Sequence, residues 1–223
     1  MAFGTLFPSS FDAFQKGTVF NLSDLQITKR SNPFLKEGVT WLHQDDQLRV
    51  GKTRVGDYLF CMTKHAPAVE VMLSVESSAI QVYFPCEADE FLVEHSFLQL
   101  LRTALECRFA LEGQVSLHSA CVELEGKAVC FTGPSGTGKS TRAQRWVADL
   151  GAEWLSGDRP GIRLTKSAVL ACGMPWDGKE RIYRNAAVPL LAICDIRRSE
   201  TVRVRRLSPR QARRVLMQQC FVP

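Results

Sequence analysis

The segment from Gly133 to Ser140 constrains the fold more than any other part of the chain, because it fills every fixed position of the pattern G-x-x-x-x-G-K-[ST]. Its glycines allow the backbone to turn tightly, so that successive amide N–H groups point inward at an anion such as a phosphate. Lys139 adds a positive charge, and Ser140 supplies a hydroxyl suited to Mg²⁺. The phosphate-binding residues expected from this motif are Gly133, Pro134, Ser135, Gly136, Thr137, Gly138, Lys139, Ser140 and Thr141.

The motif requires a strand that runs into the loop and a helix that runs out of it, and the flanking sequence supplies both. Residues 127–131 read Lys-Ala-Val-Cys-Phe, which is typical of a short buried strand. Residues 139–150 carry apolar side chains at helical spacing, and the start of such a helix favours an anion. These apolar side chains are Ala143, Trp146, Val147 and Leu150. The loop and its flanks together predict an α/β core that binds phosphate groups.

The length and composition suit one α/β domain with a smaller appendage, or two small domains. The chain has 223 residues, of which 45% are hydrophobic and 23% are charged. No apolar run is long enough to span a bilayer, and residues 1–5 lack the basic start and apolar stretch of a secretory signal. We therefore expect a cytoplasmic protein without a membrane partner.

The eight cysteines are scattered, and no two of them stand in C-x-x-C spacing. This pattern argues against a metal site or a disulfide framework. Cys130 and Cys194 stand within apolar runs, where a reduced cysteine behaves as a small core residue. We expect the cysteines to be reduced.

The formal net charge is +5, and the excess of basic residues is crowded between residues 197 and 214. A basic cluster of this kind is one feature of nucleic-acid binding proteins. However, no aromatic residues are interleaved with these arginines, and an enzyme that handles a nucleotide needs positive potential in any case. We expect a solvated, mildly basic face and no nucleic-acid partner.

Residues 1–87 predict a mainly β N-terminal region, and residues 88–223 predict a helix followed by the phosphate-binding core. Residues 69–73 and 80–84 have the character of two strands of a small antiparallel sheet. Residues 88–111 change to helical spacing. One continuous helix and a helix broken at residues 94–96 fit this pattern equally well.

Two candidate catalytic residues belong to strands near the loop. Residues 115–124 predict a strand that contains His118, joined by a tight turn to the strand at 127–131. Residues 153–156 predict a strand that delivers Asp158 to its C-terminal end, where an open α/β sheet keeps its ligand site. A carboxylate there can hold Mg²⁺ or polarise an acceptor hydroxyl. On its own, a histidine on a strand such as His118 is usually a core or surface residue, and a turn residue before proline is the alternative for Asp158.

The C-terminal part predicts a hairpin, a loop, two strands and a helix. The hairpin covers residues 161–171, and the glycine-punctuated loop at 172–181 is a candidate for the acceptor side of the site. Lys179, Arg181 and Arg184 are candidates to neutralise charge on a transferred phosphoryl group. The strands are expected at residues 188–196 and 201–205. Ser208 and Pro209 predict the start of a last helix through Gln219.

The segment LHSACVELEGKAVCFTGPSGTGKST, followed by a helix and then WLSGDRPGIR, resembles the catalytic core of the HPr serine kinase/phosphorylase family. The resemblance extends to its short relatives, which include kinases of peptide-modification gene clusters. It covers about residues 113–220 and implies a P-loop kinase core. It also implies that Lys139 touches the β- and γ-phosphates of ATP and that Ser140 and Asp158 face Mg²⁺. His118 matches the histidine that the family has before its loop. Since kinases of this family form rings, a homo-oligomer is a further expectation.

The chain departs from the family pattern at two positions. The family has two adjacent carboxylates where Gly157 and Asp158 stand, and the missing first one is usually the base. The family's acidic residue after the loop serine is replaced by Thr141. Three alternatives remain. Asp158 serves both metal and acceptor, or His118 or Asp177 is the base, or the protein binds a nucleotide without phosphorylating anything.

These features predict an ATP- and Mg²⁺-dependent phosphotransferase that phosphorylates a hydroxyl. The expected acceptor is a serine on a peptide or small protein, and the expected catalytic residues are His118, Lys139 and Asp158. Two alternatives are a nucleotide-binding regulatory module with weak or no kinase activity, and a small-molecule kinase.

Overall fold

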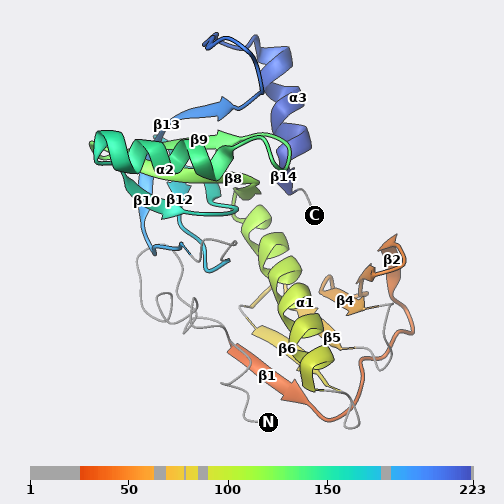
Figure 1. Cartoon of the computed structure of the whole chain (residues 1–223). Helices are drawn as coiled ribbons and strands as arrows, with labels where there is room; N and C mark the ends of the chain where they lie inside the picture. Colours follow the sequence, from red (N-terminus) through yellow and green to blue (C-terminus); the bar gives the residue numbers. More distant parts are fainter. Residues whose placement is uncertain (1–25, 63–68, 78, 85–89, 177–181, 222–223) are drawn as a thin grey trace. The chain divides into compact units, whose positions relative to one another are not determined.

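The computed structural model describes residues 26–62, 69–77, 79–84, 90–176 and 182–221. Within these residues, two sheets and three helices form a mixed α/β fold, the class that the sequence predicts (Figure 1). The chain divides into two compact units. The first unit contains the described residues up to Arg108, and the second contains those from Phe109 onward. The sequence pattern places a boundary after residue 87, before the long helix, whereas this division falls in the last turn of that helix.

The first unit is built on a six-stranded sheet in the order β1-β6-β5-β4-β3-β2. Strands β1 and β6 pair in parallel, and the other neighbours pair antiparallel. The predicted antiparallel pair at residues 69–84 is therefore confirmed as β5 and β6. The strands are β1 (Gln26–Arg30), β2 (Thr40–Gln44), β3 (Leu48–Lys52), β4 (Tyr58–Met62), β5 (Glu70–Leu73) and β6 (Ala79–Tyr83).

Helix α1 (Glu90–Leu111) is continuous, so the alternative with a break at residues 94–96 is wrong. Among the side chains of α1 that the structure describes, from Ser96 onward, buried apolar residues recur at spacings of three and four, which is the pattern of a helix with one face in a core. The ring of Phe97 stacks against Phe84, with the ring centroids 5.5 Å apart. The fully buried side chains of α1 are Phe97, Leu100, Leu101, Ala104 and Leu105. The helix ends before Gly113, whose φ of 78° lies in the left-handed region that favours glycine.

The second unit is built on an eight-stranded sheet in the order β10-β8-β9-β13-β12-β11-β7-β14. Strands β9 and β13 pair in parallel, and the other neighbours pair antiparallel. The strands are β7 (Gln114–Leu117), β8 (Ser119–Leu124), β9 (Lys127–Thr132), β10 (Glu153–Ser156), β11 (Gly161–Leu164), β12 (Val169–Cys172), β13 (Ala187–Asp195) and β14 (Cys220–Phe221). The helices are α2 (Lys139–Leu150) and α3 (Pro209–Gln219).

The single strand predicted at residues 115–124 is wrong, because the chain changes partners at His118. Strand β7 pairs with β11, whereas β8 pairs with β9. These two strands stand near opposite ends of the strand order, yet one residue joins them. The sheet must therefore curve back on itself so that the two ends approach each other at His118.

Strands β8 and β9 are buried on both faces, in keeping with their nearly continuous apolar sequences. On β8 and β9, Cys121 and Cys130 contribute to a core inside the curved sheet that includes Leu117 and Leu155. The alternate residues of the same strands face a second core, which includes Ala143 of α2. The ring of Trp146 on α2 meets Phe131 of β9 edge to face, with centroids 5.2 Å apart. Helix α2 therefore covers the outer face of β8 and β9.

Local signals for turns and caps are confirmed. Glu125 and Gly126 both have positive φ, 51° and 73°, as a two-residue hairpin turn of the primed type requires. The hairpin predicted at residues 161–171 is formed by β11 and β12. Ser208 caps α3, since its side chain accepts a hydrogen bond from the backbone amide of Gln211. In return, the Gln211 side chain accepts a hydrogen bond from the backbone amide of Ser208, which completes a capping box.

Two other expectations are wrong. Residues 201–205 form no strand, and Val202 and Val204 are 93% and 96% exposed. Alternation alone gave the strand signal there, and no strand of the described residues pairs with this segment. Leu150, expected in the apolar stripe of α2, is 53% exposed at the end of that helix.

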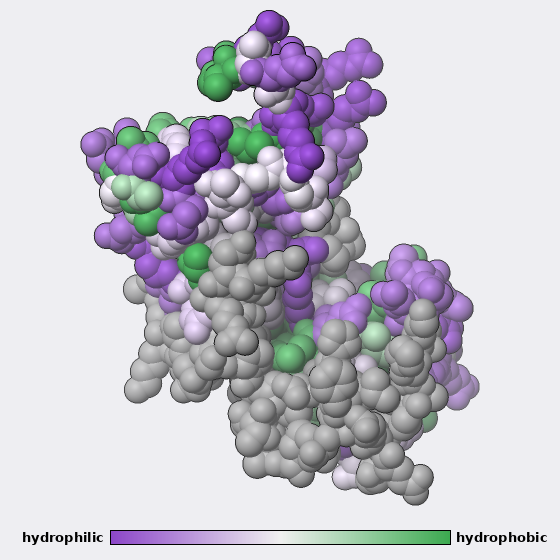
Figure 2. Space-filling view, in the orientation of Figure 1, coloured by the Kyte–Doolittle hydropathy of each residue, from purple (hydrophilic) through white to green (hydrophobic). Residues whose placement is uncertain are grey.

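Hydrophilic side chains predominate around α3 and the segment before it in Figure 2, with a few hydrophobic ones among them. The arginines between residues 197 and 214 are all exposed, as expected of a solvated face. The seven cysteines within the described residues form no disulfide with one another. Among the helices of the described residues, none combines the length and apolar character needed to cross a membrane.

Candidate functional site

Strand register brings four chain segments to one edge of the second sheet. Thr132, the last residue of β9, lies opposite Asp195 of the parallel strand β13 and opposite Ser119, the first residue of the antiparallel strand β8. The loop that follows Thr132, the residue before Ser119 and the residues after Asp195 therefore meet at this edge. Strand β10 runs antiparallel to β8, with Ser156 opposite Cys121. It delivers Asp158 to the same edge.

The loop after β9, Gly133–Gly138, is called the glycine loop here, and its backbone explains its composition. Gly133, Gly136 and Gly138 have φ values of 141°, 76° and 98°, which L side chains rarely adopt. At Gly133 a Cβ atom would also lie 2.8 Å from the carbonyl oxygen of Ile196 on the chain that leaves β13. The glycines are thus required by backbone torsion, and at Gly133 also by the close approach of another chain segment.

Lys139 lies over the glycine loop at the start of α2. Its Nζ donates hydrogen bonds to the carbonyl oxygens of Gly133, at 3.0 Å, and Pro134, at 3.3 Å. The N-cap residue of α2 is Gly138, no side chain caps the helix start, and its first turn has no acidic residue. The first amide groups of α2 and the ammonium group of Lys139 therefore offer positive potential to an anion at the loop. Ser140, in the first turn, is half-buried.

The turn that carries Asp158 is fixed by buried hydrogen bonds. The hydroxyl of Ser156 donates to the backbone carbonyl of Asp158 at 2.7 Å, and the amide of Gly157 donates to the carbonyl of Ile182 at 2.9 Å. Arg159 has a φ of 50°, a conformation that costs a non-glycine residue about 1 kcal/mol. Such local strain clusters at functional sites.

His118 lies at the point where β7 passes into β8, and its backbone is held on both sides. Its amide donates to the carbonyl of Gln219 at 2.8 Å, and its carbonyl accepts a hydrogen bond from the Thr132 hydroxyl at 2.8 Å. Burial lowers the pKa of His118, the nearby charge of Lys139 lowers it further, and Asp158 opposes the shift. The charges of Lys139 and Asp158 therefore both act on His118, the third predicted catalytic residue. The lowered pKa favours the neutral imidazole, and a neutral imidazole can accept a proton.

The lowered pKa of His118 predicts a dependence of stability on pH. The unfolded chain takes up a proton on this histidine near pH 6.5, whereas the folded protein does so only at lower pH. Stability from neutral His118 is thus fully present above pH 6.5 and is lost as the pH falls from 6.5 through the folded pKa. We expect urea unfolding between about pH 7.5 and about pH 5.5 to show a smaller loss of stability for His118→Gln than for wild type. Parallel pH dependences would contradict this expectation.

Three residues at the site were not predicted to belong to it. Asp195 ends β13 beside the glycine loop and pairs with Arg197, with Nε and Oδ2 2.8 Å apart. Arg198 donates through Nη2 to the carbonyl of Gly136 at 2.8 Å. The signal for Asp195 was an apolar run ending in a carboxylate, LLAICD, but only strand pairing shows that this run lies next to β9.

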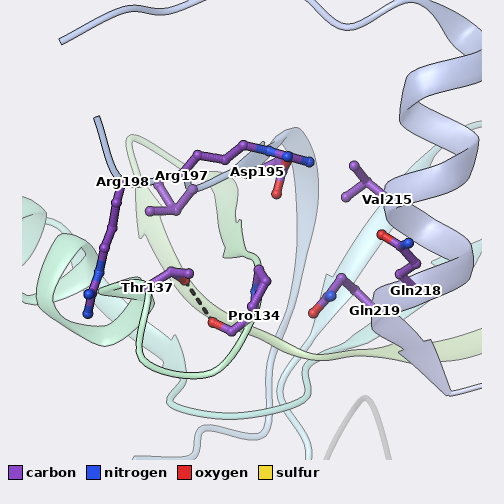
Figure 3. A pocket seen from close by; sticks show the side chains of 9 residues that line it. Pro134, Thr137, Asp195, Arg197, Arg198, Val215, Gln218 and Gln219 are labelled. Carbon is purple, nitrogen blue, oxygen red and sulfur yellow. Dashed lines mark hydrogen bonds and ion pairs between the residues drawn. The ribbon is translucent and has the colours of Figure 1, made fainter. Parts of the chain in front are cut away.

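A cavity of about 390 Å³ opens between the glycine loop and α3 (Figure 3). Pro134 and Thr137 line it from the loop side, where the Thr137 hydroxyl donates to the Pro134 carbonyl at 2.8 Å. Arg197 and Arg198 line it from the segment after β13. In Figure 3, Val215, Gln218 and Gln219 extend into it from α3.

The predicted acceptor loop is only partly described. Asp177, Lys179 and Arg181 lie outside the described residues. Arg184 binds the carboxylate of Glu153, with Nη1 and Oε2 2.6 Å apart, and also pairs with Glu123. It therefore joins β8 to β10, which is a structural role different from the expected neutralisation of a phosphoryl group.

The described residues contain no group of three or more His, Cys, Asp or Glu side chains that could hold a metal ion. A Mg²⁺ ion bound with a nucleotide needs fewer protein ligands, because phosphate oxygens and waters complete its shell. The Ser140 hydroxyl and the Asp158 carboxylate, delivered to one sheet edge, fit that requirement.

In comparisons with known proteins, no family model matches the chain. No curated protein matches it either.

Proposed function

We propose that this protein is an ATP- and Mg²⁺-dependent phosphotransferase with a P-loop kinase core, acting on a hydroxyl group. A serine on a peptide or small protein is the proposed acceptor, in keeping with the resemblance to HPr serine kinase/phosphorylase. One observation carries the proposal. A glycine loop with three positive-φ glycines leads into an uncapped helix start, and His118 and Asp158 reach the same sheet edge.

Each group of residues has its own role in the proposed reaction. The amides of the glycine loop and the ammonium group of Lys139 bind phosphate oxygens, and Lys139 stabilises charge on the transferred group. Ser140 and Asp158 hold Mg²⁺, which neutralises charge on the β- and γ-phosphates when bound.

The acceptor hydroxyl forms a bond to the γ-phosphorus as the bond to the ADP oxygen breaks, and its proton passes to a base. Neutral His118 suits that base role, and Asp158 is the alternative. Because phosphoryl transfer depends mainly on positioning and charge, the glycine at position 157 lowers the rate without forbidding the reaction.

The test is transfer of label from γ-labelled ATP, with Mg²⁺, to a panel of serine-containing peptides and small proteins. We expect Asp158→Asn to lower the rate about 10²-fold or more, because the carboxylate acts on the metal or the acceptor. Asp149→Asn, which removes an exposed carboxylate of α2, is the matched control and should leave the rate unchanged. A wild type that transfers label to no acceptor, and to water no faster than Asp158→Asn, would overturn the proposal.

Gly157 favours a second candidate, a nucleotide-binding module that regulates a partner. Here the protein binds MgATP and is stabilised by it without turnover. The variant Gly157→Asp separates the two functions. Transfer gained only in this variant would identify a nucleotide-binding protein that has lost its base, whereas transfer by the wild type supports the kinase.

A further inference from the structure

The positive charge of this protein is concentrated in the segment between β13 and α3 and in the first turns of α3. Residues 197–214 contain eight arginines and one glutamate, a net charge of +7, whereas the whole chain has a net charge of +5. The rest of the chain is therefore slightly acidic. All eight arginines are exposed. A field concentrated in this way attracts an anionic partner to one part of the surface.

Most of these arginine side chains have no partner within the described residues. Arg197 pairs with Asp195, and Arg198 donates to the carbonyl of Gly136. The side chains of the other six form no ion pair or hydrogen bond with the described residues; these are Arg203, Arg205, Arg206, Arg210, Arg213 and Arg214. A guanidinium group binds a carboxylate through two parallel hydrogen bonds, so this group of arginines suits a partner that carries several carboxylates.

The backbone of residues 202–206 also lacks partners. These residues lie in no helix, strand or turn, and their amide and carbonyl groups form no hydrogen bond with the described residues. In Figure 1 they belong to the loop at the top of the picture that joins β13 to α3. Val202 and Val204 are the most exposed large hydrophobic residues of the described chain. Unpaired backbone groups beside exposed apolar side chains are a template on which another chain can form a strand.

The sequence of this segment indicates which partner fits it. Residues 202–205 alternate valine and arginine, so a strand formed here presents its valines on one face and its arginines on the other. A partner strand that alternates apolar and acidic residues covers the valines and sets carboxylates opposite the guanidinium groups. A second copy of this chain fits poorly, because arginines would face arginines. Nucleic acid fits poorly as well, since no aromatic residue between 197 and 214 offers a surface for base stacking.

This segment lies close to the proposed kinase site. Arg198 contacts the glycine loop through the carbonyl of Gly136, and Arg197 and Arg198 line the cavity beside that loop. Val202 follows Arg198 by four residues, which span at most about 14 Å of extended chain. A polypeptide bound to residues 202–206 is therefore held near the edge of the sheet where the glycine loop lies.

We propose that residues 201–206, called the docking segment here, bind an acidic segment of the phosphoacceptor protein by strand pairing. The inference rests on the proposed kinase function, which identifies the partner as the acceptor. It defines the substrate class as a polypeptide in which a run of alternating acidic and apolar residues accompanies the accepting serine. The docking segment supplies backbone hydrogen bonds and apolar cover, and the surrounding arginines supply charge complementarity.

The first experiment measures the binding of a fluorescent peptide to the full chain by anisotropy, without nucleotide. The probe contains three Glu-Val repeats, and its controls replace every glutamate with glutamine or with lysine. We expect the glutamate peptide to bind about tenfold more tightly than the glutamine peptide, and the lysine peptide to show no binding. Raising the salt concentration from about 0.05 M to about 0.5 M should weaken binding of the glutamate peptide. Equal affinities for the glutamate and glutamine peptides would overturn the proposal.

Charge reversal locates the binding site. The double variant Arg203→Glu with Arg205→Glu should lower the affinity for the glutamate peptide about tenfold or more and should gain binding of the lysine peptide. A merely structural effect would not produce that gain. The double variant Lys127→Glu with Arg145→Glu makes the same change in charge at exposed positions of β9 and α2 and is the matched control. Equal losses of affinity in the two double variants would mean that net charge alone attracts the peptide, contrary to the proposal.

Hydrogen exchange tests the strand pairing itself. A strand directs alternate amides toward its neighbour, so every second amide of residues 202–206 should exchange more slowly when the glutamate peptide is bound. Unchanged exchange in this segment would exclude a paired strand. Two competing partners are tested alongside: a DNA duplex of about 20 base pairs, and vesicles of phosphatidylcholine with phosphatidylserine. Tighter binding of either one than of the glutamate peptide would assign the segment to another kind of partner and overturn the proposal.

Phosphoryl transfer separates this inference from the proposed function. Transfer from labelled ATP is compared for a serine peptide with and without the three Glu-Val repeats. The repeats should lower KM about tenfold and leave kcat unchanged, and the Arg203→Glu, Arg205→Glu variant should remove the difference. If neither peptide nor any other acceptor is phosphorylated although the repeats bind, the proposed function fails and the docking segment stands as a binding site. If both peptides are phosphorylated with equal KM, the docking role is wrong and the kinase stands.

Discussion

Replacing Lys139 with alanine is expected to lower phosphoryl transfer about 10²- to 10³-fold, the usual effect of removing one preorganised charged or hydrogen-bonding group from a transition-state site. The ammonium group of Lys139 contacts the carbonyls of Gly133 and Pro134, where it is placed for phosphates bound by the loop. The measurement is transfer from labelled ATP, together with titration of MgATP. Affinity for MgATP should fall as well, because in the proposed function the lysine contacts both the bound nucleotide and the transition state.

Lys127→Ala is the matched control for this prediction. Lys127 is the exposed first residue of β9, the strand that leads into the glycine loop. Its replacement removes one positive charge, as Lys139→Ala does, but at the far end of the strand from the loop. It should retain both activity and affinity. Equal activity of wild type and Lys139→Ala would contradict the phosphate-binding role of the loop.

Gly173→Ala is expected to cost about 3 kcal/mol of folding stability or more, the upper range for overpacking a core. A Cβ atom on the buried Gly173 would lie 1.7 Å from the carbonyl oxygen of Arg184 and 3.1 Å from that of Leu155. Both atoms belong to the backbone, so no side-chain rotation relieves the clash. The amide of Gly173 also donates a hydrogen bond to the carbonyl of Ala186 at 2.9 Å. A backbone shift that relieved the clash would disturb this bond. Urea unfolding measures the loss.

Gly126→Ala provides the comparison for a glycine required by torsion alone. Its φ of 73° is unfavourable for alanine, but a Cβ atom would meet nothing within 4 Å, whereas at Gly173 the obstacle is the backbone clash and not the torsion. We expect a loss of about 1 kcal/mol. Equal losses for the two variants would mean that the packing of the Arg184 segment against Gly173 is not as tight as its backbone contacts indicate.

The elements that the sequence predicted well are those set by neighbouring residues. The β8–β9 turn follows from two adjacent residues with positive φ, and the start of α3 follows from Ser208, Pro209 and Gln211. The glycine loop belongs to the same class, because its torsions require glycine at three defined positions. Each of these signals spans only a few residues, so the interactions that favour the turn or cap do not depend on long-range contacts.

The elements that the sequence mispredicted depend on distant partners. Alternating apolar residues gave a strand signal at 115–124 and at 201–205 alike. The first segment is divided at His118 because its two halves pair with different strands, β7 with β11 and β8 with β9. The second segment forms no strand because no strand of the described residues pairs with it. Alternation reports which residues suit a sheet, whereas pairing decides whether a strand exists.

The candidate site also has some parts set by local sequence and others set by contacts between distant segments. The sequence identified the glycine loop and its lysine from a local motif and Asp158 from its place after a predicted strand, whereas His118 became a candidate through the resemblance to HPr serine kinase/phosphorylase. Only the tertiary structure placed Asp195, Arg198 and Gln219 beside that loop. The parallel pairing of β13 with β9, and the return of α3 to His118 through β14, join segments that are far apart in the chain. No local pattern encodes such contacts, since they are fixed by the burial and hydrogen bonding of the whole sheet.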